Sequence, residues 1–354
     1  MACSGHLGLN FHYATPEQAR ALAADPATLA LIHFGDRQGV SGGGESGPLE
    51  IRVGLAVLGD ESPVEVWRAS GPVTRGYHDQ VHYALADELM FGCLHLPNAP
   101  DEDPREVTRR AYRMILAAVG ATGYPHLLRV WNYLPAINAQ VHGLERYRAF
   151  CQGRAEVFEA LEDHEHRLPA ATAIGTREGG LLIYFLSARQ PPRHLENPRQ
   201  VSAFRYPRCY GPRSPSFARA SLWQPDETRA DLFVSGTASI VGHESRHPDD
   251  PGAQLEESLR NVQNLLQHAV EQCGLREGDS RRLSLLKVYL RRGADYPVAW
   301  QALMRHLSGA VPTLWLEGDI CRQELLVEME GLYTEIVSSM PEQAPGPQTS
   351  GHGP

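Results

Sequence analysis

The sequence is almost without lysine: among 354 residues only Lys287 is present, so arginine carries nearly all of the positive charge. The formal net charge of -9 at pH 7 argues against a nucleic-acid partner held by phosphate contacts, although a small anionic ligand is still compatible with it. No run approaches the roughly 20 apolar residues of a membrane span. The N-terminus has no basic region followed by an apolar stretch, so we expect no signal peptide and a cytoplasmic protein.

The six cysteines are scattered, and no two of them form a C-x-x-C pair. Their spacing does not match a zinc site and does not imply a disulfide framework. Residues 163–167 (DHEHR) contain two histidines, but no third cluster has metal-ligand spacing, so we expect an exposed polar turn there. Glycine-rich nucleotide motifs and the G-x-S-x-G nucleophile motif are also absent. We therefore expect neither a metal ion nor an organic cofactor.

The periodicity of apolar residues predicts two similar halves, each with strands followed by a helix, a strand and a helix. We expect an α/β (α+β) fold of two related domains, residues 1–165 and 166–340, with mixed sheets and helices packed on one face. Residues 341–354 are rich in proline, glycine and glutamine and are expected to be disordered. One predicted helix starts at Pro16, and the others cover residues 103–119, 143–161, 256–271 and 297–307. The predicted strands cover residues 51–57, 64–67, 80–84, 90–94, 126–134, 171–176, 181–188, 232–240, 283–290, 313–316 and 321–331.

The last predicted strand, residues 321–331 (CRQELLVEMEG), alternates apolar and acidic side chains and carries a thiol, Cys321, at its start. If the acidic face meets solvent, its carboxylates are ordinary solubilising groups. If it faces a cleft, one of them is a candidate proton donor, and the rest of the sequence favours the cleft. The apolar face holds Leu325, Val327 and Met329, and the acidic face holds Glu324, Glu328 and Glu330.

A loop at residues 197–220 concentrates arginine and tyrosine and is stiffened by four prolines. Arginine binds a carboxylate through two parallel hydrogen bonds, and tyrosine adds a hydroxyl at a small cost in entropy. The loop fits either a preorganised anion-binding wall or a solvated basic loop over a sheet edge. Residues 235–239 (SGTAS) end a predicted strand, where small residues let either a ligand or a helix approach the backbone.

Five longer motifs are specific enough to compare with known families: residues 131–135 (WNYLP), 146–150 (RYRAF), 197–200 (NPRQ), 210–220 (YGPRSPSFARA) and 235–245 (SGTASIVGHES). Together they resemble the chorismatase family. Residues 205–335 also resemble the YjgF/RidA fold, so the resemblance implies two YjgF-like, chorismate-mutase-like domains, the second of them catalytic. The arginine that YjgF/RidA proteins place beside a bound carboxylate corresponds to Thr313, which argues against imine deamination.

The resemblance implies chorismate as the substrate and pyruvate as one product. The acid of the family corresponds to Glu328, which protonates the methylene carbon of the enolpyruvyl ether and makes an oxocarbenium ion. A cysteine seven residues before the acid, here Cys321, marks the branches that make hydroxybenzoates. An alanine in the SGT strand, here Ala238, is associated with the hydrolytic branch. We expect 3-hydroxybenzoate, alone or with 4-hydroxybenzoate; the alternative is a hydrolase that gives a trans-dihydrodiol cyclohexadiene carboxylate.

The resemblance also implies the residues of the site, with Glu328 and Cys321 as the catalytic pair. Chorismate is a small dianion, so two arginine sites are needed, and Arg148 and Arg213 are assigned to its carboxylates. We expect a monomer or weak oligomer with no nucleic-acid or membrane partner. The rival hypothesis is a non-catalytic YjgF-like module that senses a small metabolite. The expected substrate-binding residues are Tyr133, Arg148, Tyr206, Arg213, Arg219, Gly236 and Ala238.

Overall fold

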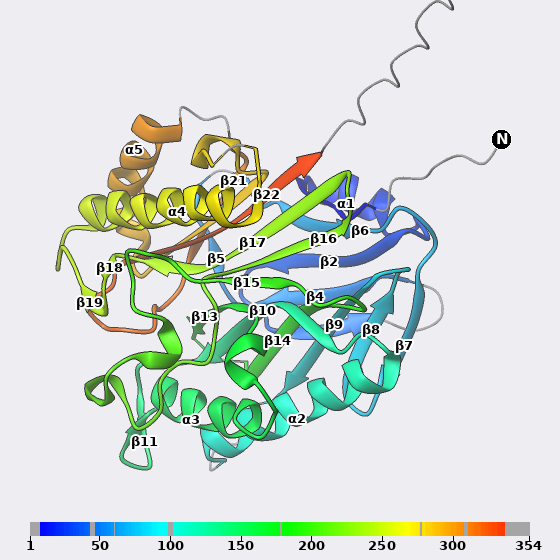
Figure 1. Ribbon diagram of the computed structural model, residues 1–354, viewed down its shortest axis with the longest axis horizontal. Coiled ribbons are helices and arrows are strands. Elements are labelled where there is room, and N and C mark those ends of the chain that lie inside the picture. The colour runs from blue at the N-terminus through cyan, green and yellow to red at the C-terminus, as the bar shows by residue number, and fades with distance from the viewer. Residues whose placement is uncertain are drawn as a thin grey trace, which may run out of the picture.

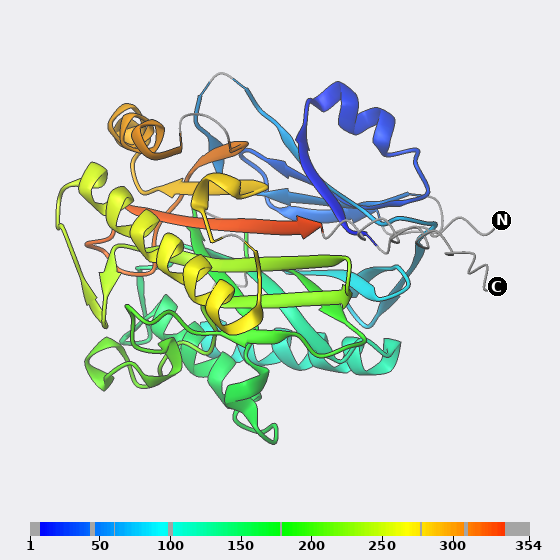
Figure 2. The same ribbon diagram turned by 45° about the horizontal axis from the view of Figure 1, so that its top comes forward.

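Three mixed β-sheets pack around a shared apolar core, with helices on their outer faces (Figures 1 and 2). The computed structural model describes residues 8–42, 47–59, 61–97, 102–177, 179–276, 278–307 and 311–336. No helix within these residues is long and apolar enough to cross a membrane. The expected α+β class with mixed sheets and helix-covered faces is confirmed, whereas the expected disordered tail at residues 341–354 and most of the glycine-rich segment at 42–47 lie outside the described residues.

The first sheet is built entirely from the N-terminal residues. One helix, α1 (Pro16–Leu22), covers it and starts with a capping box, in which Thr15 accepts from the Gln18 backbone N–H and the Gln18 side chain accepts from that of Thr15. The predicted helix start is therefore confirmed, but the sequence indicated only two of the five strands. In sheet order these are β1 (Asn10–Ala14), β6 (Val64–Arg68), β2 (Thr28–Phe34), β4 (Leu49–Val53) and β3 (Gly39–Gly42).

The second sheet has six strands and carries α2 (Pro104–Thr122) and α3 (Arg146–Phe158) on its outer face. A short hairpin of β11 (Gln140–Val141) and β12 (Leu144–Glu145) leads directly into α3. Two strands of this sheet, β13 and β14, follow the expected domain boundary at residue 165, so the sheet combines strands from both predicted domains. Its order is β13 (Ala170–Thr176), β10 (His126–Pro135), β14 (Leu181–Ala188), β9 (Leu89–Leu96), β8 (Val81–Leu85) and β7 (Thr74–His78).

The third sheet has seven strands and is covered by α4 (Pro251–Cys273) and α5 (Tyr296–Leu307). Its last strand, β5, comes from the N-terminal half and pairs with β21. A small hairpin of β18 (Ile240–Val241) and β19 (Glu244–Ser245) follows β17. The order is β15 (Arg193–Leu195), β16 (Ala220–Asp226), β17 (Arg229–Ala238), β22 (Val327–Ile336), β20 (Leu285–Leu290), β21 (Thr313–Glu317) and β5 (Ala56–Val57).

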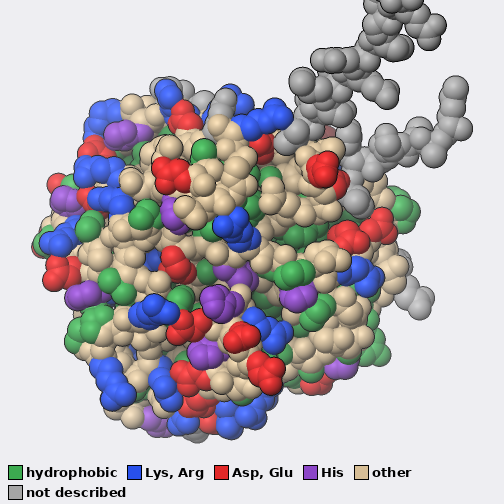
Figure 3. Space-filling view, viewed as in Figure 1, with side chains coloured by type: hydrophobic (Ala, Val, Ile, Leu, Met, Phe, Trp, Pro, Cys, Tyr) green, Lys and Arg blue, Asp and Glu red, His purple; other side chains and the backbone are tan. Residues whose placement is uncertain are grey.

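All three sheets contribute to the central core. Leu29 of β2, Phe91 of β9, Trp131 of β10, Phe233 of β17 and Tyr289 of β20 belong to one buried apolar cluster. On the surface seen in Figure 3, acidic, basic and histidine side chains are interspersed, so no large patch of one sign forms on that face.

The prediction of a strand over residues 321–331 is wrong at its start. The strand β22 begins only at Val327, because residues 321–326 form bends and a turn. Within the strand both faces are buried: Met329 is fully buried, and Glu328 and Glu330 are each 5% exposed. The carboxylates therefore point into the molecule, between the sheets, while Glu324 in the preceding turn is exposed.

Candidate active site

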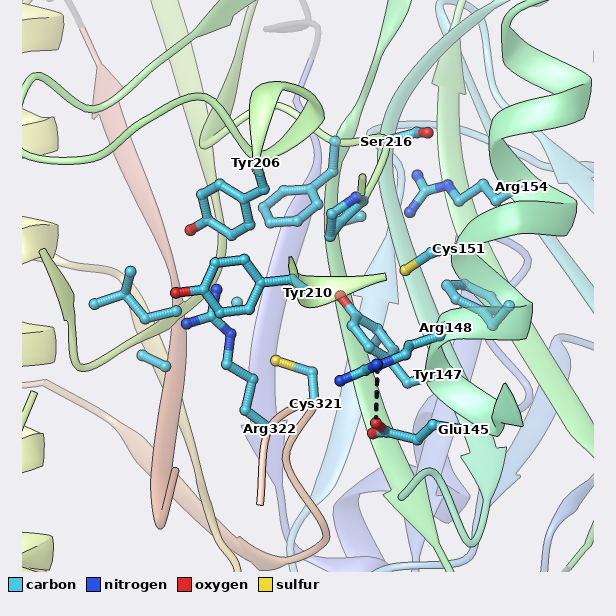
Figure 4. A pocket seen from close by; sticks show the side chains of 18 of the residues that line it. Glu145, Tyr147, Arg148, Cys151, Arg154, Tyr206, Tyr210, Ser216, Cys321 and Arg322 are labelled. Carbon is cyan, nitrogen blue, oxygen red and sulfur yellow. Dashed lines mark ion pairs between the residues drawn. The ribbon is translucent and has the colours of Figure 1, made fainter. Parts of the chain in front are cut away.

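A cavity of about 470 Å³ lies between the second and third sheets. On one side it is bounded by α3 and β13, and on the other by β17, β22, the loop before β16 and the turn before β22 (Figure 4). Eight of the nine residues predicted for the site line this cavity, although they come from both halves of the chain. They are Arg148, Tyr206, Arg213, Arg219, Gly236, Ala238, Cys321 and Glu328.

Glu328 lies at the inner wall of the cavity, on the second residue of β22. Its backbone pairs with Ala238 of β17 and with Tyr289 of β20. The register of β17 against β22 shifts between Val234 and Thr237, so Gly236 lies in an irregular stretch beside the acid. A Cβ on Gly236 would be 2.1 Å from Glu328 Oε1, so the carboxyl occupies space that only glycine leaves free.

The surroundings of Glu328 favour its protonated form. Burial raises the pKa of Glu328 to about 8, and the negative charge of Glu330 acts in the same direction against the opposing effect of Arg129 and Arg219. Among the described residues we find no hydrogen-bond partner for its carboxyl group. At neutral pH the site therefore contains a neutral carboxylic acid that opens onto a cavity, which is the state that a proton donor requires.

Two thiols reach the cavity, Cys151 from α3 and Cys321 from the turn before β22 (Figure 4). Burial raises the pKa of Cys321 to about 12, with a further contribution from Glu328. Burial likewise raises the pKa of Cys151 to about 12. Because the thiolate is the nucleophilic form, neither cysteine is prepared for attack at neutral pH. Both are better suited to shape the cavity or to hold a proton.

Three arginines at the cavity have nitrogen atoms without hydrogen-bond partners among the described residues. These atoms are Nε and Nη2 of Arg154, Nε of Arg219 and Nη2 of Arg322. Arg154 and Arg219 are each only 3% exposed. A buried guanidinium with unused donors is costly unless a ligand completes it. These three side chains are therefore the strongest candidates for binding an anion.

The two arginines that the sequence assigned to the substrate carboxylates, Arg148 and Arg213, are already paired with glutamates. Arg148 Nε lies 3.2 Å from Glu145 Oε2, and Arg213 Nη1 lies 3.3 Å from Glu159 Oε1. Their side chains are 41% and 50% exposed, at the rim of the cavity. Each therefore already has a carboxylate partner, and a bound anion would have to compete with it.

An aromatic wall closes the cavity opposite α3. The rings of Tyr206 and Tyr210 are 5.7 Å apart, and Arg322 stacks over Tyr210 with its guanidinium carbon 3.8 Å from the ring centroid. The Arg219 Nη2 donates to the Tyr206 hydroxyl at 2.7 Å. Arg322 Nη1 also donates to the His243 carbonyl at 2.9 Å, which ties the turn before β22 to the β18–β19 hairpin. The predicted arginine and tyrosine loop thus forms part of the wall.

The structure does not bring Tyr133 to the cavity. Its side chain is fully buried in the central core, and its hydroxyl lies 3.2 Å from that of Tyr184 and 3.3 Å from that of Tyr289. Strand β10 is buried on both faces, so this polar residue near the strand end packs between the sheets rather than facing a ligand.

Several residues of the cavity were missed from the sequence, chiefly Arg154, Cys151 and Arg322. Tyr147, Cys151 and Arg154 lie at i, i+4 and i+7 of the predicted helix and so share one face, which is the signal that could have identified them. Arg322 directly follows Cys321 and could have been included with it. Within the described residues no group of three His, Cys, Asp or Glu side chains is arranged to hold a metal ion.

This chain is similar in sequence to known proteins over most of its length. Residues 65–187 match the family model described as chorismatase FkbO/Hyg5-like, N-terminal. A chorismatase of Streptomyces rapamycinicus is 41% identical over 285 residues, which are 77% of this chain and 83% of the relative. A 3-hydroxybenzoate synthase of Streptomyces hygroscopicus is 37% identical over 295 residues, covering 80% and 85% of the two chains.

A solved structure extends the similarity to almost the whole chain. The crystal structure of a chorismatase at 1.08 Å resolution superimposes with a TM-score of 0.84 and 31% sequence identity, covering 92% of this chain and 98% of that one. These identities and coverages show that the chain belongs to the chorismatase family.

Proposed function

We propose that this protein cleaves chorismate to pyruvate and 3-hydroxybenzoate. The observation that carries the proposal is Glu328, a buried carboxylic acid whose pKa of about 8 keeps it protonated at neutral pH, at the wall of a cavity with unused arginine donors. The names of the relatives, chorismatase and 3-hydroxybenzoate synthase, support the same substrate and product.

In the proposed reaction Glu328 donates its proton to the methylene carbon of the enolpyruvyl ether. The double bond supplies the electron pair for the new C–H bond, and the ether carbon becomes an oxocarbenium ion. The guanidinium groups of Arg154, Arg219 and Arg322 bind the two substrate carboxylates and hold the methylene carbon against the acid. Arg148 and Arg213, at the rim, attract the dianion into the cavity. Loss of pyruvate then releases the ring.

Two outcomes are open to the cation. If water captures it, a dihydrodiol acid and pyruvate leave, with one water consumed. If a hydroxyl of the ring takes part instead, the C–O bond between the ring and pyruvate breaks, the ring loses one proton as it becomes aromatic, and no water is consumed overall. Cys321 and Ala238 both line the cavity, so both sequence markers contact the space where this competition takes place. We favour the aromatising route, which gives 3-hydroxybenzoate either alone or together with 4-hydroxybenzoate.

The test is to mix the protein with chorismate, to follow pyruvate with a coupled assay and to separate the ring products by chromatography. The proposal expects pyruvate and 3-hydroxybenzoate in equal amounts, or pyruvate equal to the sum of 3- and 4-hydroxybenzoate. The dihydrodiol acid as the main product would favour the hydrolytic alternative. Binding of chorismate without any pyruvate release would favour the non-catalytic binding module.

A further inference from the structure

The single lysine of the chain lies in a buried charged cluster. Lys287 of β20 is 4% exposed, and its ammonium group contacts two carboxylates. Its Nζ lies 2.8 Å from Glu65 Oε2, on β6 of the first sheet, and 3.0 Å from Glu330 Oε1, on β22 of the third sheet. One ammonium group therefore joins two sheets through two ion pairs.

Glu330 is held by three further donors, all from the second sheet. Arg129 Nη2 donates to its Oε2 at 2.8 Å, Thr172 Oγ1 to the same oxygen at 2.6 Å, and Trp131 Nε1 to its Oε1 at 2.7 Å. Although burial alone would raise the pKa of Glu330, Lys287 and Arg129 hold it below its usual value. Glu330 is thus kept as a carboxylate inside the protein. We call Glu65, Arg129, Lys287 and Glu330 the Lys287 cluster.

The Lys287 cluster acts electrostatically on the candidate acid. Glu328 and Glu330 are two residues apart on β22, so their side chains leave the strand on the same face. The other charged or titratable groups that act on Glu328 are Arg129 of β10 and Arg219 before β16, with Cys321 and Tyr147 as further neighbours. Burial raises the pKa of Cys321 to about 12 and that of Tyr147 well above its usual value, so both are neutral at neutral pH. Glu330 is therefore the negative charge that opposes the two arginines.

We propose that the Lys287 cluster is a positioning unit for the acid, which keeps Glu330 charged and fixed beside Glu328 so that Glu328 retains its proton until the substrate takes it. This inference rests on the proposed role of Glu328 as the proton donor. Glu330 and Lys287 do not line the cavity, so they act through Glu328 and not on the substrate. Their formal charges and those of Glu65 and Arg129 sum to zero, which allows the cluster to stay ionised while buried.

A purely structural role makes a different prediction. A cluster that only joins the sheets would lower stability when broken, but it would not change the pH at which turnover fails. The pH dependence of kcat therefore separates the two roles. A matched control is Asp231 of β17, which is fully buried, pairs with Arg229 at 2.7 Å and accepts from Thr334 at 2.7 Å. Thr334 lies six residues beyond Glu328 on β22, or about 20 Å away.

The experiment compares the alkaline limb of the kcat–pH profile for chorismate in the wild type and in Glu330→Gln, Glu330→Asp and Asp231→Asn. Removing the charge of Glu330 leaves the positive charges of the cluster unbalanced, so Glu330→Gln should move the limb to lower pH by about one to two units. Glu330→Asp keeps the charge and should keep the limb near its wild-type position. Asp231→Asn should lose stability without moving the limb.

An unchanged limb in Glu330→Gln, or the same displacement in Asp231→Asn, would overturn the proposal. If Glu330→Gln does not fold, Glu65→Gln replaces it: this change also leaves the cluster positive, so a smaller displacement to lower pH is expected and an unchanged limb contradicts the proposal. If instead Glu328 is not the proton donor, the result is different: Glu328→Gln would then release pyruvate as fast as the wild type.

Discussion

The close approach of Gly236 to Glu328 fixes the position of the carboxyl group that donates the proton in the proposed reaction. A methyl group at Gly236 would lie 2.1 Å from Glu328 Oε1 and 3.2 Å from Thr172 Cγ2. The acid has to move to accommodate it, and misplacement of a reacting group by about 1 Å costs on the order of 10²-fold in rate. We expect Gly236→Ala to lower kcat by roughly this factor, measured by pyruvate release, while the protein still folds.

The control for this change is Gly120→Ala in α2. An added Cβ at Gly120 meets no atom within 4 Å, and this glycine does not line the cavity. It should therefore leave kcat unchanged. A Gly236→Ala variant with wild-type turnover would mean that the position of the Glu328 carboxyl is not critical.

The arginines of the cavity differ in whether their donors are already used. Arg154 and Arg322 have nitrogen atoms without partners, whereas Arg148 and Arg213 pair with glutamates at the rim. Lysine keeps the positive charge but loses the planar fork. We expect Arg154→Lys and Arg322→Lys each to lower kcat/KM about tenfold or more, a cost of about 1.4 kcal/mol.

The same change at Arg148 or Arg213 is the comparison, because a rim arginine contributes mainly long-range attraction. Its effect should be several-fold smaller and should diminish as salt is added. Equal losses at all four positions would contradict the distinction between inner and rim arginines.

Cys321 is expected to influence which product forms rather than whether pyruvate is released. Its thiol lines the cavity and remains protonated because burial and Glu328 raise its pKa to about 12. Replacement by alanine removes the sulfur from the cavity in which, in the proposed reaction, the ring hydroxyl and water compete for the cation. We expect Cys321→Ala to lower 3-hydroxybenzoate relative to the dihydrodiol acid in chromatographic analysis, with pyruvate release retained. Cys93→Ala in the central core is the control, and an unchanged product ratio in Cys321→Ala would leave this thiol without a role.

At the scale of elements, the start of β22 decides the geometry of the site. A regular strand over residues 321–331 would have put Cys321 and Glu328 on opposite faces, because they are an odd number of residues apart. The turn at residues 321–326 removes this conflict and lets both reach one cavity. Alternation of apolar and acidic residues predicted the strand but could not predict where it begins, since the turn has no proline or glycine to mark it.

The starts of α1 and α2 were easier to predict than the strands because they carry local signals that were recognised, whereas α4 begins at Pro251, before the predicted residue 256, although Asp250 and Pro251 carry the same signal. Thr15 and Asp103 cap α1 and α2, each followed by a proline in the first turn, and both helices start as predicted. Most of the first sheet was missed: β1 has only five residues, too few for its alternation to be a clear signal, and β2 is an apolar run too short to distinguish from a helix by periodicity. Its strands are stabilised mainly by the distant residues that they pack against.

The candidate site could be predicted where it follows motifs and not where it depends on packing. Glu328, Cys321 and the predicted loop residues Tyr206, Arg213 and Arg219 lie in recognisable stretches of sequence, and all five line the cavity. Arg154 is one of the three arginines of α3, and only the tertiary structure buries it beside Tyr112 and Phe158. Tyr133 lies in a motif as well, but the packing of three sheets directs it into the core.

At the scale of the whole molecule, the cavity exists only because the sheets assemble around one core. Its walls come from α3 and β13 of the second sheet and from β17 and β22 of the third. Behind these walls, the Lys287 cluster connects the third sheet to β6 of the first. Ser235 joins two of these sheets directly: its Oγ accepts from the Ala171 backbone N–H at 2.9 Å. Catalytic geometry and global folding are therefore coupled in this protein.

The pH dependence of the free energy of unfolding should reveal the raised pKa of Glu328 without any measurement of turnover. The pKa of Glu328 rises from its usual 4.5 to about 8 in the fold, so its contribution to stability is fully present below about pH 4.5 and is lost as the pH rises through about 8. Glu328→Gln does not titrate. Its free energy of unfolding should therefore increase relative to the wild type, by on the order of a few kcal/mol, between pH 5 and pH 9. Urea unfolding of both proteins at pH 5 and pH 9 measures this change. If the difference in free energy of unfolding between Glu328→Gln and the wild type is the same at both pH values, Glu328 is not held neutral by the fold.

The most direct test of the central claim is pyruvate release from chorismate by Glu328→Gln. The amide matches the carboxyl in size but has no acidic proton to transfer to carbon. With chorismate binding confirmed by calorimetry, turnover should fall by about 10²- to 10⁴-fold relative to the wild type. Wild-type-like pyruvate release by a variant that binds chorismate normally would contradict the assignment of Glu328 as the proton donor.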